Sequence, residues 1–128
     1  MNLLLDTCIL IWLAERVEEL SERARNAIKD RNNNLYYRAA SVFELGIANS
    51  FKPMSKKIPI DRLINRVGAL YELKPLHFTV GAAHNLQNLP SIHKDPFDRM
   101  LICQALTHKF TLLTPDEQIH RYPVKYVW

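Results

Sequence analysis

Short apolar segments alternate with helix-length segments along this chain, and that alternation constrains its fold more than any other feature. Residues 2–5 (NLLL) end at Asp6 and precede a helix-length apolar stretch at 7–14, and residues 35–39 (LYYRA) precede another at 42–51. Further strands are predicted at 71–76, 110–114 and 124–128, and further helices at 19–31, 61–70, 79–89 and 95–108, with a short helix from Pro115. The alternation predicts an α/β fold, a three-layer α/β/α sandwich with a mostly parallel central sheet of about five strands.

Length and composition fit one domain, 1–128, with a substantial core. The chain has 128 residues, 48% of them hydrophobic, and only three glycines. Asp6 and Thr7 interrupt the apolar N-terminal run, and no basic leader precedes it, so we expect neither a signal peptide nor a membrane span, and a cytoplasmic location. Cys8 and Cys103 are predicted as reduced core residues. The net charge of +4 mildly favours a polyanionic partner.

Acidic residues follow or precede the predicted strands at one edge of the sheet. Asp6 ends the first strand, and Glu44 lies shortly after the second. Asp98 begins the helix that leads into the fourth strand, which Asp116 follows. Because sites of open parallel sheets lie beyond the carboxyl ends of the strands, we expect these carboxylates to converge. Converging carboxylates repel one another unless a cation lies between them, and oxygen ligands favour Mg²⁺ or Mn²⁺.

Most of these acids also have a purely structural interpretation. Asp95 precedes Pro96, a pair typical of a helix start, and Asp98 then falls in the first helical turn, where a carboxylate is favoured. Ser41 with Glu44 matches a capping box, and Thr114-Pro115-Asp116 matches a helix start. Asp6 is least easily explained as a cap, because a buried strand has no need of an acid at its end.

Four segments resemble the signature segments of the PIN-domain ribonucleases, and specifically the VapC-like toxins of bacterial toxin–antitoxin pairs. They are LLLDTCILIW (3–12), AASVFELGIA (39–48), HKDPFDRMLICQA (93–105) and LLTPDEQI (112–119). The resemblance implies that Asp6, Glu44, Asp98 and Asp116 bind Mg²⁺ or Mn²⁺ and form the catalytic site, with Asp95 as the adjacent cap. It also implies endonucleolytic cleavage of RNA that leaves a 5′-phosphate, a VapB-like antitoxin partner and a homodimer. An ion held in this way can activate water for attack on a phosphodiester.

Several further residues have two interpretations each. The hydroxyls of Thr7, Ser41 and Thr114 either fix the carboxylates or cap helices. Arg99 either holds a phosphate or pairs with an acid on its own helix. His93 and Lys94 either contact the RNA backbone or are solvated loop residues. Six aromatic residues are predicted to belong to the core: Trp12, Tyr36, Tyr37, Phe43, Phe78 and Phe97.

Three positions depart from the toxin pattern, and two other functions remain as alternatives. Cys8 stands where histidine is frequent, Phe43 where tryptophan is usual, and Asn49 where lysine is frequent, so Lys52, Lys56 or Lys57 would have to replace that cation. One alternative is a PIN-domain nuclease of RNA processing that is not a toxin. The other is a non-catalytic Mg²⁺-binding signalling domain, which would need paired acids after the first strand. A basic RNA-binding module is disfavoured, because acids occupy the strand ends.

Overall fold

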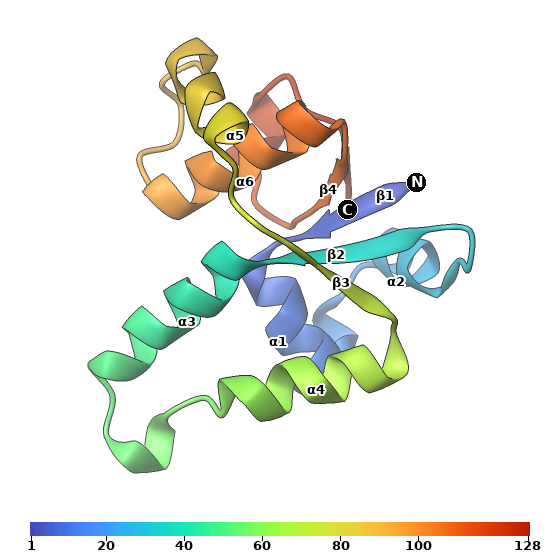
Figure 1. Ribbon diagram of the computed structural model, residues 1–128. Helices are drawn as coiled ribbons and strands as arrows, with labels where there is room; N and C mark the ends of the chain where they lie inside the picture. Colours follow the sequence, from blue (N-terminus) through green and yellow to red (C-terminus); the bar gives the residue numbers. More distant parts are fainter.

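The computed structural model describes residues 1–128 and contains a five-stranded sheet in which every strand pair is parallel (Figure 1). In chain order the strands are β1 (Asn2–Leu5), β2 (Asn34–Arg38), β3 (Leu73–Leu76), β4 (Thr111–Leu113) and β5 (Tyr126–Val127). They lie side by side in the order β3-β2-β1-β4-β5. The strands β2 and β3 therefore lie on one side of β1, and β4 and β5 lie on the other. The change of direction creates a switch point between β1 and β4. The predicted fold class is confirmed.

Six α-helices connect the strands. They are α1 (Thr7–Glu15), α2 (Glu22–Lys29), α3 (Ala39–Ser50), α4 (Ile60–Leu70), α5 (Val80–His84) and α6 (Pro96–His108). Four 3₁₀ turns occur at Val17–Glu19, Met54–Lys56, Asn85–Asn88 and Ile119–Arg121. In Figure 1, α1, α2 and α4 lie on one side of the sheet and α5 and α6 on the other, while α3 extends away from the end of β2. None of the helices is both long and apolar enough to span a membrane.

The central strand β1 divides the core into two halves. Leu3 and Leu5 pack with residues of α1, α2 and α4, whereas Leu4 packs with residues of α6 on the opposite face. All three side chains are fully buried, as the alternating directions of side chains require for a strand that is covered on both faces. The same packing keeps the C-terminal end of β1, where Asp6 follows, in a fixed position between β2 and β4.

Two predicted elements differ in the structure. The helix predicted at 79–89 is α-helical only over Val80–His84 and then tightens into a 3₁₀ turn, where the Asn85 amide donates to the hydroxyl of Thr107 on α6. The short helix predicted from Pro115 is wrong. The Asp116 side chain accepts the N–H of Gln118 and closes a turn instead, so that only the 3₁₀ turn Ile119–Arg121 follows.

The edges of the sheet are short and polar. At one edge, β3 exposes Lys74 and Pro75, and at the other β5 is only two residues long. Cys8 and Cys103 are both unpaired, as predicted, although Cys8 is only half-buried. The prediction that all six aromatic residues lie in the core is wrong for Phe43 and Phe78, which are 66% and 39% exposed.

Candidate functional site

Asp6 lies at the carboxyl end of β1 and both of its carboxylate oxygens are held. Oδ1 accepts the N–H of Thr7 at 2.7 Å, and Oδ2 accepts the hydroxyl of Thr114 at 2.6 Å. The first of these contacts makes Asp6 the N-cap of α1, so the expectation that capping explains Asp6 least is wrong. The second contact reaches across the switch point from the residue that follows β4. Asp6 thus joins the two central strands, and its side chain is only 8% exposed.

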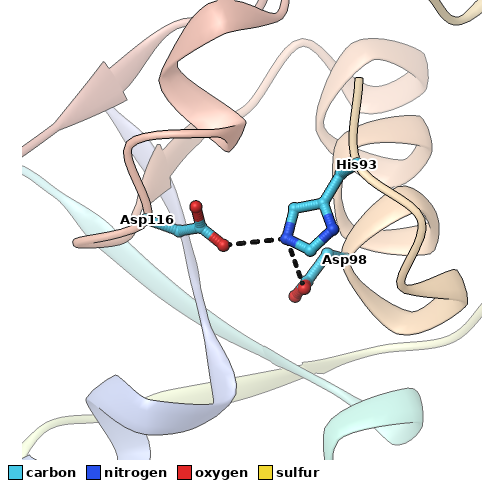
Figure 2. A group of neighbouring side chains, drawn as sticks. All are labelled: His93, Asp98 and Asp116. Carbon is cyan, nitrogen blue, oxygen red and sulfur yellow. Dashed lines mark hydrogen bonds and ion pairs between the residues drawn. The ribbon is translucent and has the colours of Figure 1, made fainter. Parts of the chain in front are cut away.

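Asp98 and Asp116 both approach the same nitrogen of the His93 imidazole. Figure 2 shows both carboxylates directed at Nε2 of the ring, which lies 2.9 Å from Asp98 Oδ2 and 3.0 Å from Asp116 Oδ2. Asp98 projects from the first turn of α6, and Asp116 from the turn after β4. One ligand atom from each of the three residues lies within 4.8 Å of the other two. These are the only three residues of the chain whose His, Cys, Asp or Glu ligand atoms gather so closely.

His93 is held firmly in this position. Its backbone N–H and that of Ile92 both donate to the hydroxyl of Tyr122, at 2.7 and 3.2 Å. Its ring Nδ1 accepts the N–H of Asp95 at 3.2 Å, which requires the proton of the neutral ring to lie on Nε2, facing the two carboxylates. The side chain is 16% exposed. The interpretation of His93 as a solvated loop residue is therefore wrong.

The two carboxyl groups beside His93 titrate differently. The pKa of Asp98 is raised to about 7 by burial first and then by the charges of Asp6, Asp95 and Asp116, with His93 opposing them. Burial also acts to raise the pKa of Asp116, but hydrogen bonds from His93 and from two backbone N–H groups outweigh it and hold that pKa below its ordinary value. Such a split is typical of carboxyl groups that share a site, because one of them bears most of the repulsion.

On α3, Ser41 and Glu44 form neither the predicted capping box nor a close group with the other predicted metal ligands. The helix begins at Ala39 with no side-chain cap, so the capping box of Ser41 and Glu44 is wrong. The fully buried Ser41 hydroxyl instead accepts a hydrogen bond from the Thr7 hydroxyl at 2.9 Å, which ties α3 to the start of α1. Glu44 is half-exposed and lies outside the group formed by His93, Asp98 and Asp116. Asn49 clamps the following loop through two hydrogen bonds to the backbone of Ile58.

The start of α6 agrees with the sequence interpretation. Asp95 is the N-cap, since its Oδ1 accepts the N–H of Phe97 at 2.8 Å, and Pro96 occupies the first helical position. Arg99 does not pair with an acid, because both ion pairs of the structure involve His93. Together with Lys94, Arg99 borders a mainly apolar pocket of about 270 Å³ between α5 and α6. These two cations are chain neighbours of His93 and Asp98.

The chemistry of this donor set fits a divalent cation. Two carboxylates face one point, and a third, Asp6, is near enough for its charge to act on Asp98. Burial first, and the charges of neighbouring carboxylates second, raise the pKa of Asp98, and a bound cation would favour its charged form. Donors dominated by carboxylate oxygen suit hard ions such as Mg²⁺ and Mn²⁺.

Replacing Thr114 with valine should destabilise the protein. The change leaves the buried Oδ2 of Asp6 without its donor, which costs about 1–3 kcal/mol, and it also removes the acceptor of the Asp116 N–H. The matched control is Thr111→Val at the start of β4, three residues earlier, where no side-chain hydrogen bond is lost and the stability should hardly change. Urea unfolding followed by circular dichroism measures both. Equal effects of the two substitutions would show that the hydrogen bonds of the Thr114 hydroxyl, to Asp6 and from Asp116, contribute no stability.

The fold and these side chains define a class of protein: a parallel α/β domain with carboxylates gathered at the carboxyl edge of its sheet. The chain belongs to the PIN domain family, whose family model matches residues 3–125. A curated relative, Ribonuclease VapC22 of Mycobacterium tuberculosis, is 27% identical over 125 residues, which cover 95% of this chain and 94% of the relative. The family resemblance predicted from the four segments is confirmed.

Solved structures of VapBC and FitAcB share the fold. VapBC2 from Rickettsia felis, bound to a DNA fragment from its promoter, matches with a TM-score of 0.75 and 17% identity over 98% of this chain and 97% of that chain. FitAcB from Neisseria gonorrhoeae matches with a TM-score of 0.65 and 20% identity over 97% of this chain and 95% of that chain. At these identities the likeness establishes the fold, and the function has to be argued from the site.

Proposed function

We propose that this protein is an endoribonuclease that depends on Mg²⁺ or Mn²⁺ and acts in the cytoplasm as the toxin of a toxin–antitoxin pair. The observation that carries the proposal is the convergence of Asp98 and Asp116, with Asp6 close by, at the switch point of a PIN-domain sheet. The ribonuclease name of the curated relative, which covers nearly the whole chain, supports the choice of RNA as substrate.

In this proposal Asp6, Asp98 and Asp116 bind the ion, and Glu44 completes the acidic group from α3. The bound ion supplies Lewis-acid chemistry: an activated water molecule and compensation of the charge that develops on the phosphate. The protein's own residues set the geometry. Thr7 and Thr114 fix the two oxygens of Asp6, and the hydrogen bond from His93 keeps Asp116 ionised. No side chain acts as a covalent nucleophile.

The RNA backbone is proposed to contact the cations beside the acidic group. Lys94 is exposed and Arg99 half-buried, and both border the pocket between α5 and α6. Each directly follows a site residue, His93 or Asp98, so a phosphate held there would lie near the carboxylates.

Protein partners are proposed for the exposed apolar side of α3. Phe43, Ile47, Phe51 and Met54 are 66%, 40%, 87% and 82% exposed along this helix and the loop that follows. An apolar surface of this kind is typical of protein–protein contacts. The similar solved structures are complexes of VapBC and FitA–FitB type, which supports a VapB-like antitoxin as one partner. A second copy of this chain, giving a homodimer, is the other.

Purified protein should cut single-stranded RNA internally in the presence of Mn²⁺ or Mg²⁺, and this cleavage should stop when EDTA removes the ion. The products should carry 5′-phosphates, which a 5′-phosphate-dependent exonuclease detects. Cleavage that survives EDTA would contradict the proposed site, and metal binding without any cleavage would favour a non-catalytic domain.

The same preparation tests the toxin assignment. Expression of the protein alone should arrest growth, and co-expression with the product of a neighbouring gene should give a complex in which cleavage is suppressed. Metal-dependent cleavage without growth arrest or a complex would instead indicate an RNA-processing nuclease of the same family.

A further inference from the structure

A buried arginine at the end of β2 is left unexplained by the proposed function. Arg38 is the last residue of β2, and its side chain is 0% exposed. Its Nη1 donates to the backbone carbonyl of Phe97, in the first turn of α6, at 2.9 Å. Its Nε and Nη2 are buried and have no hydrogen-bond partner. The burial of a charged guanidinium costs much more free energy than one hydrogen bond contributes. Other interactions must therefore stabilise the charge of Arg38.

The candidate site supplies that stabilisation. Burial lowers the pKa of Arg38, and the charges of four carboxylates oppose this effect, in decreasing order Asp6, Glu44, Asp98 and Asp95. None of these carboxylates forms an ion pair with Arg38, because the two ion pairs of the structure both involve His93. Arg38 therefore neutralises no single acid. Its charge acts on the group as a whole, through protein interior where water screens little.

The contact with Phe97 explains only part of this arrangement. It links the end of β2 to the helical turn that carries Asp98, and a neutral donor could provide that link equally well. A neutral donor would also avoid the cost of burying a charge. The presence of a permanently charged side chain, whose charge interacts most with those of Asp6 and Glu44, thus requires an electrostatic reason.

We propose that Arg38 is a built-in cation of the acidic site that lowers its affinity for divalent ions and restricts it to one bound ion. The inference rests on the proposed metal site. With Arg38 present, one divalent ion leaves the four carboxylates Asp6, Glu44, Asp98 and Asp116 with a single uncompensated negative charge. A second divalent ion would leave a net positive charge in a half-buried site, which the electrostatics oppose. Glu44 lies apart from the His93 group, and the charge of Arg38, which it shares with the other three acids, takes the place of a second ion there.

Two substitutions separate the charge of Arg38 from its hydrogen bond. Arg38→Gln removes the charge and keeps an N–H donor, whereas Arg38→Lys keeps the charge and alters the donor. Each is titrated with Mn²⁺ by isothermal calorimetry after metal is stripped from the protein, and each is melted in EDTA. Arg38→Gln should bind Mn²⁺ at least about tenfold more tightly, because repulsion between the ion and the guanidinium is removed. Its stoichiometry should rise from one ion to two, and its melting temperature in EDTA should fall, whereas Arg38→Lys should bind like the wild type.

The outcomes are decisive in both directions. Wild-type affinity and stoichiometry in Arg38→Gln would show that Arg38 serves only the Phe97 contact. Absence of Mn²⁺ binding in both the wild type and Arg38→Gln would also overturn the inference, while the RNA cleavage assay reports separately on the proposed function. If Arg38→Gln is unfolded in EDTA, recovery of its circular dichroism spectrum with Mn²⁺ supports the inference. Persistent unfolding at saturating Mn²⁺, with Arg38→Lys folded, contradicts it.

Discussion

The rate of RNA cleavage by an Asp98→Asn variant should be more than about a hundredfold lower than that of the wild type, and its expression should not arrest growth. The helix α6 and the rest of the fold should remain intact. The substitution removes one of the two carboxylates that face the same point beside His93 and therefore a proposed ligand of the ion. It preserves the shape of the side chain and its place in the first turn of α6. Initial rates on a fluorescent RNA, with circular dichroism as the test of folding, measure the effect.

Asp95→Asn is the matched control, three residues away on the same helix turn. Asparagine caps helices as well as aspartate does, so the contact with the N–H of Phe97 can be kept. The control should retain activity within a few-fold of the wild type. Full activity of Asp98→Asn would remove Asp98 from the site, and equal losses in both variants would indicate an effect of charge around the start of α6 without a specific ligand.

The second large effect that we expect of Asp98→Asn is on the free energy of unfolding in EDTA, and it depends on pH. The folded-state pKa of Asp98 is about 7, above its ordinary value of 3.8, so the folded protein binds more protons than the unfolded chain between these limits. The free energy of unfolding therefore falls as the pH rises from about 4 to 7. At pH 8 the carboxylate is mostly charged, and Asp98→Asn should be more stable than the wild type by about 1–2 kcal/mol, after allowance for solvent screening. Near pH 4 the difference should vanish.

Adding Mn²⁺ at pH 8 should make the wild type more stable than Asp98→Asn, the reverse of their order of stability in EDTA. An ion that binds only the folded state stabilises it by about 2.7 kcal/mol at a hundred times its dissociation constant, and Asp98→Asn should lose most of that gain. Thermal denaturation with and without Mn²⁺ measures both parts. A lower stability of Asp98→Asn in EDTA together with an unchanged response to Mn²⁺ would rule out a shared acidic site. Asp6→Asn is a poorer choice, because Asp6 also caps α1.

The fold was predictable because the pattern of apolar residues within each short segment indicates whether that segment forms a strand or a helix. Three consecutive leucines in β1 can be buried only where both faces of a sheet are covered, and that requirement already implies helices on both sides. The predicted helix from Pro115 was wrong for a reason of the same local kind. The sequence Thr-Pro-Asp suits both a helix start and a side-chain turn, and the second wins because Thr114 is held by Asp6.

The site was predictable only in part. Asp98 and Asp116 could be placed together because each adjoins a strand or helix whose position the topology fixes. The role of His93 depends on contacts with Asp116 and Tyr122, 23 and 29 residues away, and no periodic pattern records such contacts. The only local hint was its place two residues before a helix cap. Arg38 gave a weaker signal still, since a charged residue that ends a strand is ordinarily expected in solvent.

The edges of the sheet restrict how this protein can assemble. Pro75 on β3 has no N–H to offer an added strand, Lys74 beside it is charged, and β5 is too short to serve as a template. Edge-to-edge aggregation and recognition of a partner by strand addition are both disfavoured as a result. Docking through side chains on the surface of the helices and loops is favoured instead, so the affinity and the choice of partner can change by substitution there without any change in the sheet that carries the acids.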